Sequence, residues 1–295
     1  MAVRIVTDST SYIPRELRDE YGIIVVSLGV VFSDGQYREE DVENEWFYRK
    51  MAESGEVPTS SQPSLGELTD AFESVVSVGD EVVGVFISAE MSGTLAGAEL
   101  AAQGVRERMP DAVIELVDAR SNSMQLGAVA LAAARAAAAG GTVADVVRSA
   151  EETRLRTRFV FTPDTLDYLR RGGRIGGASA LLGSVLQIKP ILTVEGGRVE
   201  ALEKVRTKRR AHARLVEIVL ADVARAGIEE IWVHHIDDEA EGGQVVAMLA
   251  AELEREIPLV SIGPVVGLHV GPGTVGIVLQ TERPLRNSIE EAPNA

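Results

Sequence analysis

The sequence predicts an α/β protein with two α/β domains, the first built on a mostly parallel sheet and the second on a mixed sheet. The chain has 295 residues, which exceeds the length at which one hydrophobic core usually keeps growing. Strand-like apolar runs alternate with helix-like runs in the first half, as expected for parallel strands joined by helices. The pattern of strand-like and helix-like runs changes near residue 156. We therefore expect one domain over residues 1–156 and another over residues 157–295.

In the first domain, local signals mark where helices begin and end. A helix begins near Pro14, because proline fits the first helical turn, and it ends before Gly22, which favours the conformation that follows a helix. Residues 23–32 predict a long strand or a hairpin arm. The other expected strands cover residues 3–6, 81–88 and 112–117, and the expected helices cover residues 14–21, 44–54, 64–76, 94–109, 124–139 and 143–156.

In the second domain, Glu195-Gly196-Gly197 lies between two strand-like runs and predicts a hairpin. The polar tail over residues 282–295 contains two prolines and is expected to fray. The expected strands cover residues 159–162, 191–194, 198–205, 230–236, 259–262 and 275–280, and the expected helices cover residues 164–170, 178–186, 207–226 and 239–256.

The composition indicates a soluble globular protein, with 45% apolar and 25% charged residues. The net charge of −16 argues against a nucleic-acid binder or a protein that adsorbs to anionic membranes. The absence of cysteine excludes disulfides, thiolate metal sites and cysteine nucleophiles. Because the amino terminus leads directly into a strand-like run, we expect a cytoplasmic protein. The longest apolar stretch, residues 126–139, is too short for stable membrane insertion.

Three segments rich in hydroxyl groups or glycine lie where strand-like or helical runs end, at residues 58–64, 88–94 and 269–273. Such positions present N–H groups and hydroxyls to an anion. Ser92 or Thr94 could instead be an ordinary N-cap of the following helix, and Asp8 an ordinary cap or turn residue. Hydrogen-bond donors without an obvious pair of nucleophile and base predict a site that holds an anionic head group.

Two basic clusters stand out in this acidic chain. Each could be a solvated surface or a docking site for an acidic partner, and the sequence leaves both interpretations open. The first cluster contains Arg170, Arg171 and Arg174, and the second contains Lys204, Arg206, Lys208, Arg209 and Arg210.

We expect neither a metal ion nor a cofactor. His234 and His235 lie on a strand-like run and should point to opposite faces, which fits a structural role. No spacing of carboxylates predicts a metal site. Residues 271–276 match the dinucleotide pattern G-x-G-x-x-G, but they lead into a strand rather than a helix.

An enzyme is the alternative interpretation, with a serine such as Ser92 as nucleophile and His269 as base, acting as a hydrolase or on another small acylated or phosphorylated substrate. Residues 89–93 lack the first glycine of the G-x-S-x-G elbow, and the spacing identifies no acidic partner for His269. We therefore assign no catalytic residue.

Taken together, the motifs resemble those of the DegV family of bacterial fatty-acid-binding proteins. The resemblance covers essentially the whole chain and implies a two-domain α/β protein that encloses one long-chain fatty acid between its domains. It also implies that the carboxylate is presented to a separate fatty acid kinase, which forms an acyl phosphate for phospholipid metabolism. Seven segments carry the resemblance in order: Thr7-Asp8-Ser9-Thr10, Thr59-Ser60-Ser61-Gln62-Pro63-Ser64, Ser92-Gly93-Thr94, Tyr168-Leu169-Arg170-Arg171-Gly172-Gly173-Arg174-Ile175, Ile188-Lys189-Pro190-Ile191-Leu192, Val205-Arg206-Thr207 and His269-Val270-Gly271-Pro272-Gly273.

Matched by motif, the resemblance places the carboxylate contacts on a small set of donors and places two arginines near the head group or the partner. The chain departs slightly from the family pattern, with Ser60 where members often have a second threonine and Ser88-Ala89 where they often have two serines. The implied protein is a lipid carrier rather than an enzyme. The expected ligand contacts are Ser60, Ser92, Gly93, Thr94 and His269, and the expected head-group or partner residues are Arg174 and Arg206.

Overall fold

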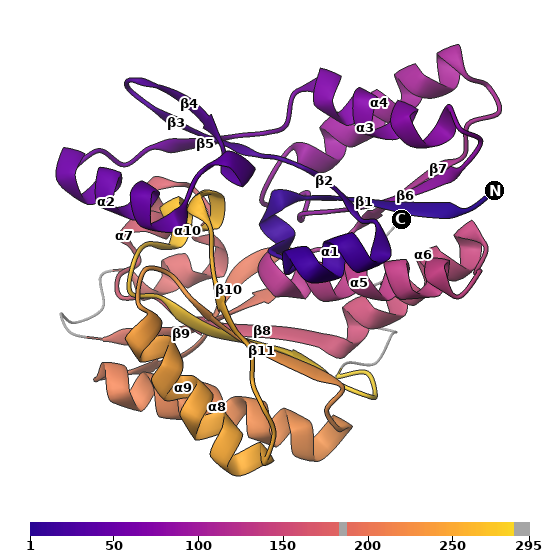
Figure 1. Ribbon diagram of the computed structural model, residues 1–295. Coiled ribbons are helices and arrows are strands. Elements are labelled where there is room, and N and C mark those ends of the chain that lie inside the picture. The colour runs from indigo at the N-terminus through magenta and orange to yellow at the C-terminus, as the bar shows by residue number, and fades with distance from the viewer. Residues whose placement is uncertain (183–187, 286–295) are drawn as a thin grey trace. The chain divides into compact units, whose positions relative to one another are not determined.

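The computed structural model describes residues 1–182 and 188–285, which pack into two compact units (Figure 1). Unit 1 comprises Met1–Asp41 and Ser60–Arg154, and unit 2 comprises Val42–Thr59 and Leu155–Ala295. The main division thus falls two residues before the domain boundary expected from the sequence. Val42–Thr59, which lies in the first half of the sequence, packs with unit 2.

Unit 1 contains a parallel sheet with the strand order β2-β1-β6-β7, which confirms the parallel sheet predicted for the first half. Its hydroxyl-rich loops follow the carboxyl ends of strands, where ligands bind in open α/β sheets. The strands are β1 (Val3–Asp8), β2 (Ile24–Val26), β6 (Glu81–Phe86) and β7 (Ile114–Asp118), and the helices are α1 (Arg15–Tyr21), α3 (Leu65–Val76), α4 (Thr94–Arg108), α5 (Ser123–Ala138) and α6 (Val143–Arg156).

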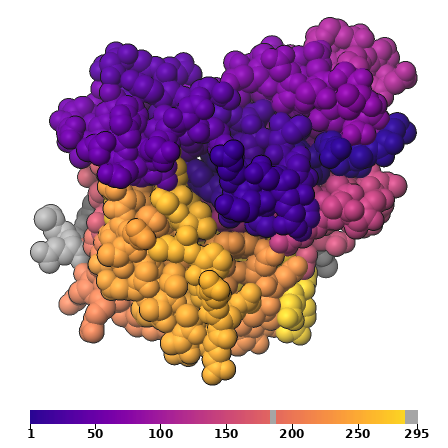
Figure 2. Space-filling model, viewed as in Figure 1, coloured from indigo at the N-terminus to yellow at the C-terminus, as the bar shows by residue number. Residues whose placement is uncertain are grey.

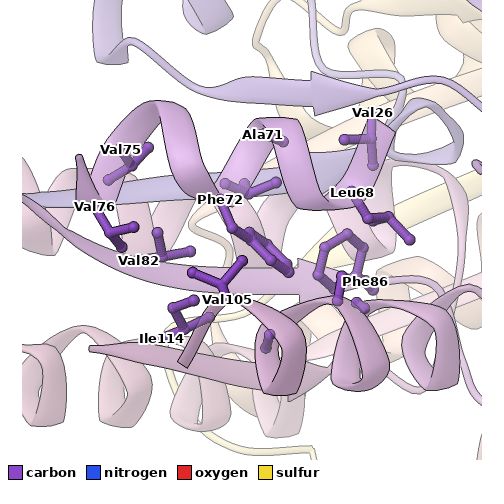
Figure 3. Close-up of a cluster of buried hydrophobic side chains, with 14 of the residues drawn as sticks. Val26, Leu68, Ala71, Phe72, Val75, Val76, Val82, Phe86, Val105 and Ile114 are labelled. Carbon is purple, nitrogen blue, oxygen red and sulfur yellow. The ribbon is translucent and has the colours of Figure 1, made fainter. Parts of the chain in front are cut away.

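The apolar face of α3 packs against β6 and α4 in the core of unit 1 (Figure 3). Leu68 and Phe72 lie one helical turn apart, so both face the strand. The rings of Phe72 and Phe86 meet edge to face with their centroids 6.5 Å apart. Complete burial of one such side chain contributes roughly 1.5–3 kcal/mol, so this cluster fixes α3 and β6 beneath the loops that they carry.

The run over residues 23–32 forms two strands in different sheets rather than one long strand. β2 ends at Val26, and β3 (Gly29–Phe32) pairs antiparallel with β4 (Gly35–Arg38) in a small sheet of order β4-β3-β5, whose third strand is β5 (Thr59–Ser61). The break occurs at Leu28, because its N–H donates to Ser9 Oγ (3.0 Å) and its carbonyl accepts from Glu39 N (2.9 Å). These bonds take Leu28 out of the parallel ladder.

Unit 2 contains a mixed sheet with the strand order β10-β9-β8-β13-β11-β12 among the described residues, as predicted for the second half. Among the strand pairs of this sheet within the described residues, only β11 and β12 run parallel to each other. The predicted hairpin joins β9 to β10 through Gly196 and Gly197, which both have positive φ. The strands are β8 (Thr157–Thr162), β9 (Lys189–Glu195), β10 (Arg198–Val205), β11 (Glu230–His235), β12 (Leu259–Ser261) and β13 (Val275–Gln280).

Two long helices, α8 (Lys208–Ala226) and α9 (Glu239–Leu253), pack on this sheet and share its core. The outer side of α9 is exposed and appears in orange on the surface in Figure 2. Unit 2 also contains α2 (Asn44–Ser54), α7 (Asp167–Arg171) and α10 (Pro264–Val270). No helix within the described part of the chain is long and apolar enough to cross a membrane.

Two expectations for unit 2 need correction. The helix expected over residues 178–186 is a 3-10 helix, Gly176–Leu181, in its described part, and residues 183–187 lie outside the described residues. Gly176 has a positive φ (+50°) and the segment begins with two glycines, which disfavour a regular α-helix. The expected frayed tail is ordered at its start, because Arg283 N donates to Ala226 O (3.1 Å). Residues 286–295 lie outside the described part.

Candidate functional site

The carboxyl ends of β1 and β6 are joined by the side chain of Asp8. Its Oδ1 accepts from Thr10 N (3.0 Å) and from the Thr10 hydroxyl, and its Oδ2 accepts from Ile87 N (2.7 Å). Asp8 also caps the short 3-10 helix Ser9–Ser11, so the cap interpretation of this residue is confirmed. Burial raises the pKa of the Asp8 carboxyl from 3.8 to about 6. Asp8 therefore fixes the start of the loop that runs from Ile87 toward α4.

That loop is a tight turn that carries Ser92, Gly93 and Thr94. Met91 N and Ser92 N both donate to Ser88 O at 3.0 Å. The hydroxyls of Ser92 and Thr94 lie 2.9 Å apart, and Thr94 N donates to Ser92 Oγ (3.3 Å). The N-cap of α4 is Gly93, which has no side chain to cap the helix, so neither Ser92 nor Thr94 is the N-cap itself. First-turn N–H groups have no acceptor within their own helix, and the helix dipole favours an anion there.

The second hydroxyl segment lies beside the first within unit 1. A Cβ atom at Gly93 would lie only 2.5 Å from Gln62 Nε2, so the Gln62 side chain passes directly over the Gly93 backbone. Ser60 lies two residues before Gln62, on β5, and is half-buried. Unit 1 thus packs Gln62 on the turn that carries Ser92, Gly93 and Thr94, and Ser60 lies two residues from Gln62 along the chain. Gln62 belongs to the motif at residues 59–64, but the sequence gave no reason to assign it a role.

His269 lies on a short helix rather than in a glycine-flanked loop. It is the sixth residue of α10, which begins at Pro264 and is followed by Gly271 with φ +91°. This helix is held by α2, because Tyr48 Oη donates to Ile262 O (3.0 Å) at the entry to α10. Gly267 gives the Tyr48 hydroxyl room, since a Cβ there would overlap it. No sequence signal pointed to Tyr48.

The basic glycine turn and the His269 segment lie together in unit 2. A Cβ atom at Gly172 would overlap His269 Nδ1, so the Gly172 backbone contacts the imidazole directly. Arg174 folds back on the same turn and donates from Nη1 to Gly172 O (2.6 Å). The ring of Tyr168 lies against Gly271 in the same way, which packs α7 on the end of α10.

The imidazole of His269 is neutral at pH 7. Its pKa is lowered to about 4, mainly by burial and in smaller part by the positive charge of Arg174. A neutral imidazole donates one hydrogen bond and accepts another. A carboxylate placed beside this ring would raise the pKa of His269 by favouring the charged form.

The second basic cluster divides into paired and unpaired side chains. Lys208 forms an ion pair with Asp238 (2.8 Å) and Arg210 forms one with Glu217 (2.5 Å). Arg206 is exposed in the loop between β10 and α8 and forms no ion pair with any described residue. Lys204 on β10 and Arg209 on α8 are also exposed and form no ion pair with a described residue. Arg206 is thus available to an external anion.

The remaining histidines are buried, and His212 Nδ1 lies 3.2 Å from Glu241 Oε2. His234 and His235 are 2% and 9% exposed on β11, and burial lowers the pKa of His234 to about 3. Within the described ranges, no group of three or more His, Asp or Glu side chains could hold a metal ion.

The arrangement supplies two sets of neutral hydrogen-bond donors, one in each unit. Unit 1 offers hydroxyls and the first-turn amides of α4, and unit 2 offers the imidazole of His269 with Arg174 nearby. Such groups suit the recognition of a carboxylate or phosphate.

Comparison with known proteins identifies the family. A sequence model of the family described as uncharacterised protein, DegV family, matches residues 2–282. A DegV domain-containing protein of Clostridium acetobutylicum is 48% identical over 286 residues, which cover 97% of this chain and 100% of that protein. Protein DegV of Bacillus subtilis is 34% identical, over 94% of this chain and 98% of that protein. The chain therefore belongs to the DegV family.

Solved structures of DegV proteins share the fold. One is described as fatty acid binding of a DegV family protein from Thermus thermophilus. It has a TM-score of 0.85 and 33% identity and covers 95% of this chain and 100% of that chain. Another is described as DegV, a fatty acid binding protein from Bacillus subtilis. It has a TM-score of 0.85 and 32% identity and covers 95% of this chain and 99% of that chain.

Proposed function

We propose that this protein binds a long-chain fatty acid and presents its carboxylate to a separate kinase for acyl-phosphate formation. The observation that carries the first part is the likeness to two solved DegV structures described as fatty acid binding, each more than 30% identical over 95% of this chain. Ser60, Ser92, Gly93, Thr94 and His269 contact the carboxylate in this proposal. The protein acts as a carrier and not as an enzyme.

The two ends of the ligand contribute differently to its affinity. Burial of methylene groups contributes about 0.8 kcal/mol each, so a sixteen-carbon chain offers on the order of 10 kcal/mol. One hydrogen bond to a charged group such as the carboxylate contributes about 1.5–3 kcal/mol. The acyl chain therefore supplies most of the affinity, while the hydroxyls and the imidazole set the orientation of the carboxylate and its ionisation state.

The direct test is to denature the purified protein, extract it with solvent and analyse the extract by mass spectrometry. A fatty acid in a 1:1 ratio to protein is the expected result. A delipidated sample that neither contains nor takes up palmitate would refute the proposal. Release of a hydrolysed acyl product from small esters, abolished in both Ser92→Ala and His269→Ala, would instead support the hydrolase.

Replacement of Ser92 by alanine is expected to weaken fatty-acid binding by about 1–3 kcal/mol, because one hydrogen bond to a charged oxygen is lost. This is roughly a 5- to 150-fold rise in Kd. The ligand should still bind, since the acyl chain is untouched. Titration calorimetry of delipidated protein with palmitate measures the change. Ser74→Ala is a matched control, because the Ser74 hydroxyl donates to the Ala71 carbonyl within α3. Equal affinity in Ser92→Ala and the parent would remove Ser92 from the site.

The kinase step rests on the exposed basic groups of unit 2. In this proposal Arg206 docks an acidic surface of the kinase and Arg174 serves the head group or the partner. The substrate is a cytoplasmic fatty acid and the product enters phospholipid metabolism. A docking role predicts dependence on ionic strength, because exposed charges are screened over about 8 Å at physiological salt.

Replacement of Arg206 by alanine is expected to leave bound fatty acid unchanged and to slow acyl-phosphate formation by a partner kinase several-fold. Added salt should reproduce the defect in the parent. The measurement is acyl-phosphate formation with purified kinase, alongside ligand occupancy by mass spectrometry. Arg210→Ala is the control, because Arg210 lies in the same cluster but pairs with Glu217. Normal transfer by Arg206→Ala would leave Arg206 as a solvated surface residue.

A further inference from the structure

Unit 1 contains a cavity of about 340 Å³ at the edge of its sheet where β1, β6 and β7 begin. The amino terminus, marked N in Figure 1, lies at this edge, where Glu81 N donates to Ala2 O (2.9 Å). The loop that carries Ser92, Gly93 and Thr94 follows the carboxyl end of β6. Since parallel strands begin at one edge and end at the other, this cavity is separate from the candidate head-group site.

The lining of the cavity is mainly apolar. Its floor is formed where the last turns of α3 and α4 approach the sheet. Val113 lies beside β7, and its side chain is 38% exposed. A ligand in the cavity would cover part of this apolar surface. The apolar lining residues are Met1, Val76, Met109, Pro110, Ala112 and Val113.

Charges of both signs surround the cavity, because the amino-terminal ammonium of Met1 and the guanidinium of Arg4 lie near Asp80, but the carboxylates outnumber them. Asp80, Glu81 and Asp111 also line it. Asp80 is satisfied by Ala2 N (2.8 Å) and Arg4 Nε (3.2 Å), and the amino-terminal ammonium contributes to its lowered pKa. Glu81 and Asp111 form no ion pair with a described residue. Two carboxylates thus remain available at the rim of an apolar cavity.

The helices strengthen this preference for a cation. The carboxyl ends of α3 and α4 meet at the cavity through Val76 and Met109, and the end of a helix carries a partial negative charge. Two nearby arginines are directed elsewhere: Arg108 pairs with Glu73 (2.6 Å), and Arg106 donates to Ile114 O. Among the described residues a third, Arg4, pairs with Asp80 and not with Glu81 or Asp111.

We propose that this cavity binds a small primary alkylammonium ligand. The alkyl chain lies on Val76, Met109 and Val113, and the ammonium group contacts Glu81 and Asp111. A volume of about 340 Å³ falls at the lower end of the range for small-molecule sites, roughly 300–1,000 Å³. That size favours a free amine over a protein segment. Apolar contact alone would accept any short chain, so the carboxylates give the site its selectivity for a cation.

The test is NMR of protein labelled with carbon-13 in the methionine methyl groups, with the Met109 signal assigned by Met109→Leu. Hexylammonium, hexanol and hexanoate share the same chain and differ in head group. Hexylammonium is expected to shift the Met109 signal in a saturable manner, with an affinity at least tenfold above that of hexanol, while hexanoate leaves the signal unchanged. The double variant Glu81→Gln/Asp111→Asn should lose this tenfold preference.

Glu99→Gln is the charge control, because Glu99 is exposed on α4 and does not line the cavity. The signals of the other methionines report whether each variant keeps its fold. No shift with hexylammonium, or equal shifts with hexylammonium and hexanol, would overturn the proposal. A retained preference in the folded double variant would also overturn it. None of these outcomes depends on the fatty-acid function.

Discussion

Replacement of Asp8 by asparagine should remove a contribution to stability that falls by roughly 2 kcal/mol between pH 4 and pH 7. Asp8 is fully buried, and its carboxyl accepts hydrogen bonds from Thr10 and from Ile87 N. Burial dominates over these bonds and raises the pKa of the carboxyl from 3.8 to about 6. The difference between these values corresponds to about 3 kcal/mol over the full titration.

The sign follows from which state binds the proton more tightly. Because the folded state holds the proton of Asp8 up to about pH 6, while the unfolded state releases it near 3.8, this group favours folding most at low pH. That contribution is lost as the pH rises from about 3.8 to about 6. Asparagine does not titrate, so the stability of the parent minus that of Asp8→Asn should fall over this interval.

Urea unfolding of both proteins at pH values from 4 to 7 gives this difference curve. Taking the difference cancels the titration of the other carboxyls. Asp80→Asn is an informative control, because hydrogen bonds from Ala2 N and Arg4 lower the pKa of Asp80 below 3.8, so its difference curve should stay nearly flat between pH 4 and pH 7. A flat curve for Asp8→Asn would mean that Asp8 titrates normally in the folded protein.

Regular elements with clear signals could be predicted from the sequence with good accuracy. The helix expected over residues 44–54 is found as Asn44–Ser54, and the strand expected over residues 198–205 is found as Arg198–Val205. The helix expected over residues 64–76 is found as Leu65–Val76, and Ser64 caps it in a capping box with Glu67. In each case helical periodicity, a hairpin signal or a capping residue agrees with the tertiary packing.

Short elements held by distant contacts could not be predicted. α10 has seven residues, begins with Pro264 and contains Gly267, so it offers no helical period. Its helix depends on Tyr48, which lies 214 residues before Ile262 in the chain. β5 has three hydroxyl residues and lacks the apolar alternation of a strand. The placement of α2 in unit 2 is likewise a tertiary effect.

The candidate site shows the same division. The hydroxyl segments and His269 are visible as motifs, whereas the packing of Gln62 on Gly93 and of Gly172 on His269 depends on three-dimensional neighbours. The glycine pair at residues 172–173 allows close approach of another side chain, but the sequence does not show which side chain approaches. The structure identifies it as the imidazole.

Replacement of Gly172 by alanine should therefore reduce fatty-acid affinity by about 10- to 100-fold while the protein stays folded. The new methyl group would occupy the position of His269 Nδ1, so the imidazole must move. The backbone of Gly172 has φ −74°, which alanine adopts without strain. If His269 donates to the carboxylate, its displacement costs about 1.5–3 kcal/mol, the contribution of a hydrogen bond to a charged group.

A double-mutant cycle separates this explanation from a general disturbance of unit 2. The dissociation constant for palmitate is measured in Gly172→Ala, His269→Ala and the double variant. If alanine at position 172 acts only by moving the imidazole, it should cause no further loss once His269 is absent. Gly243→Ala is the control, because Gly243 lies on α9 with no atom within 4 Å of an added Cβ. Additive losses in the double variant would show that Gly172 acts on binding by a route other than His269, and unchanged affinity in Gly172→Ala would remove His269 from the carboxylate site.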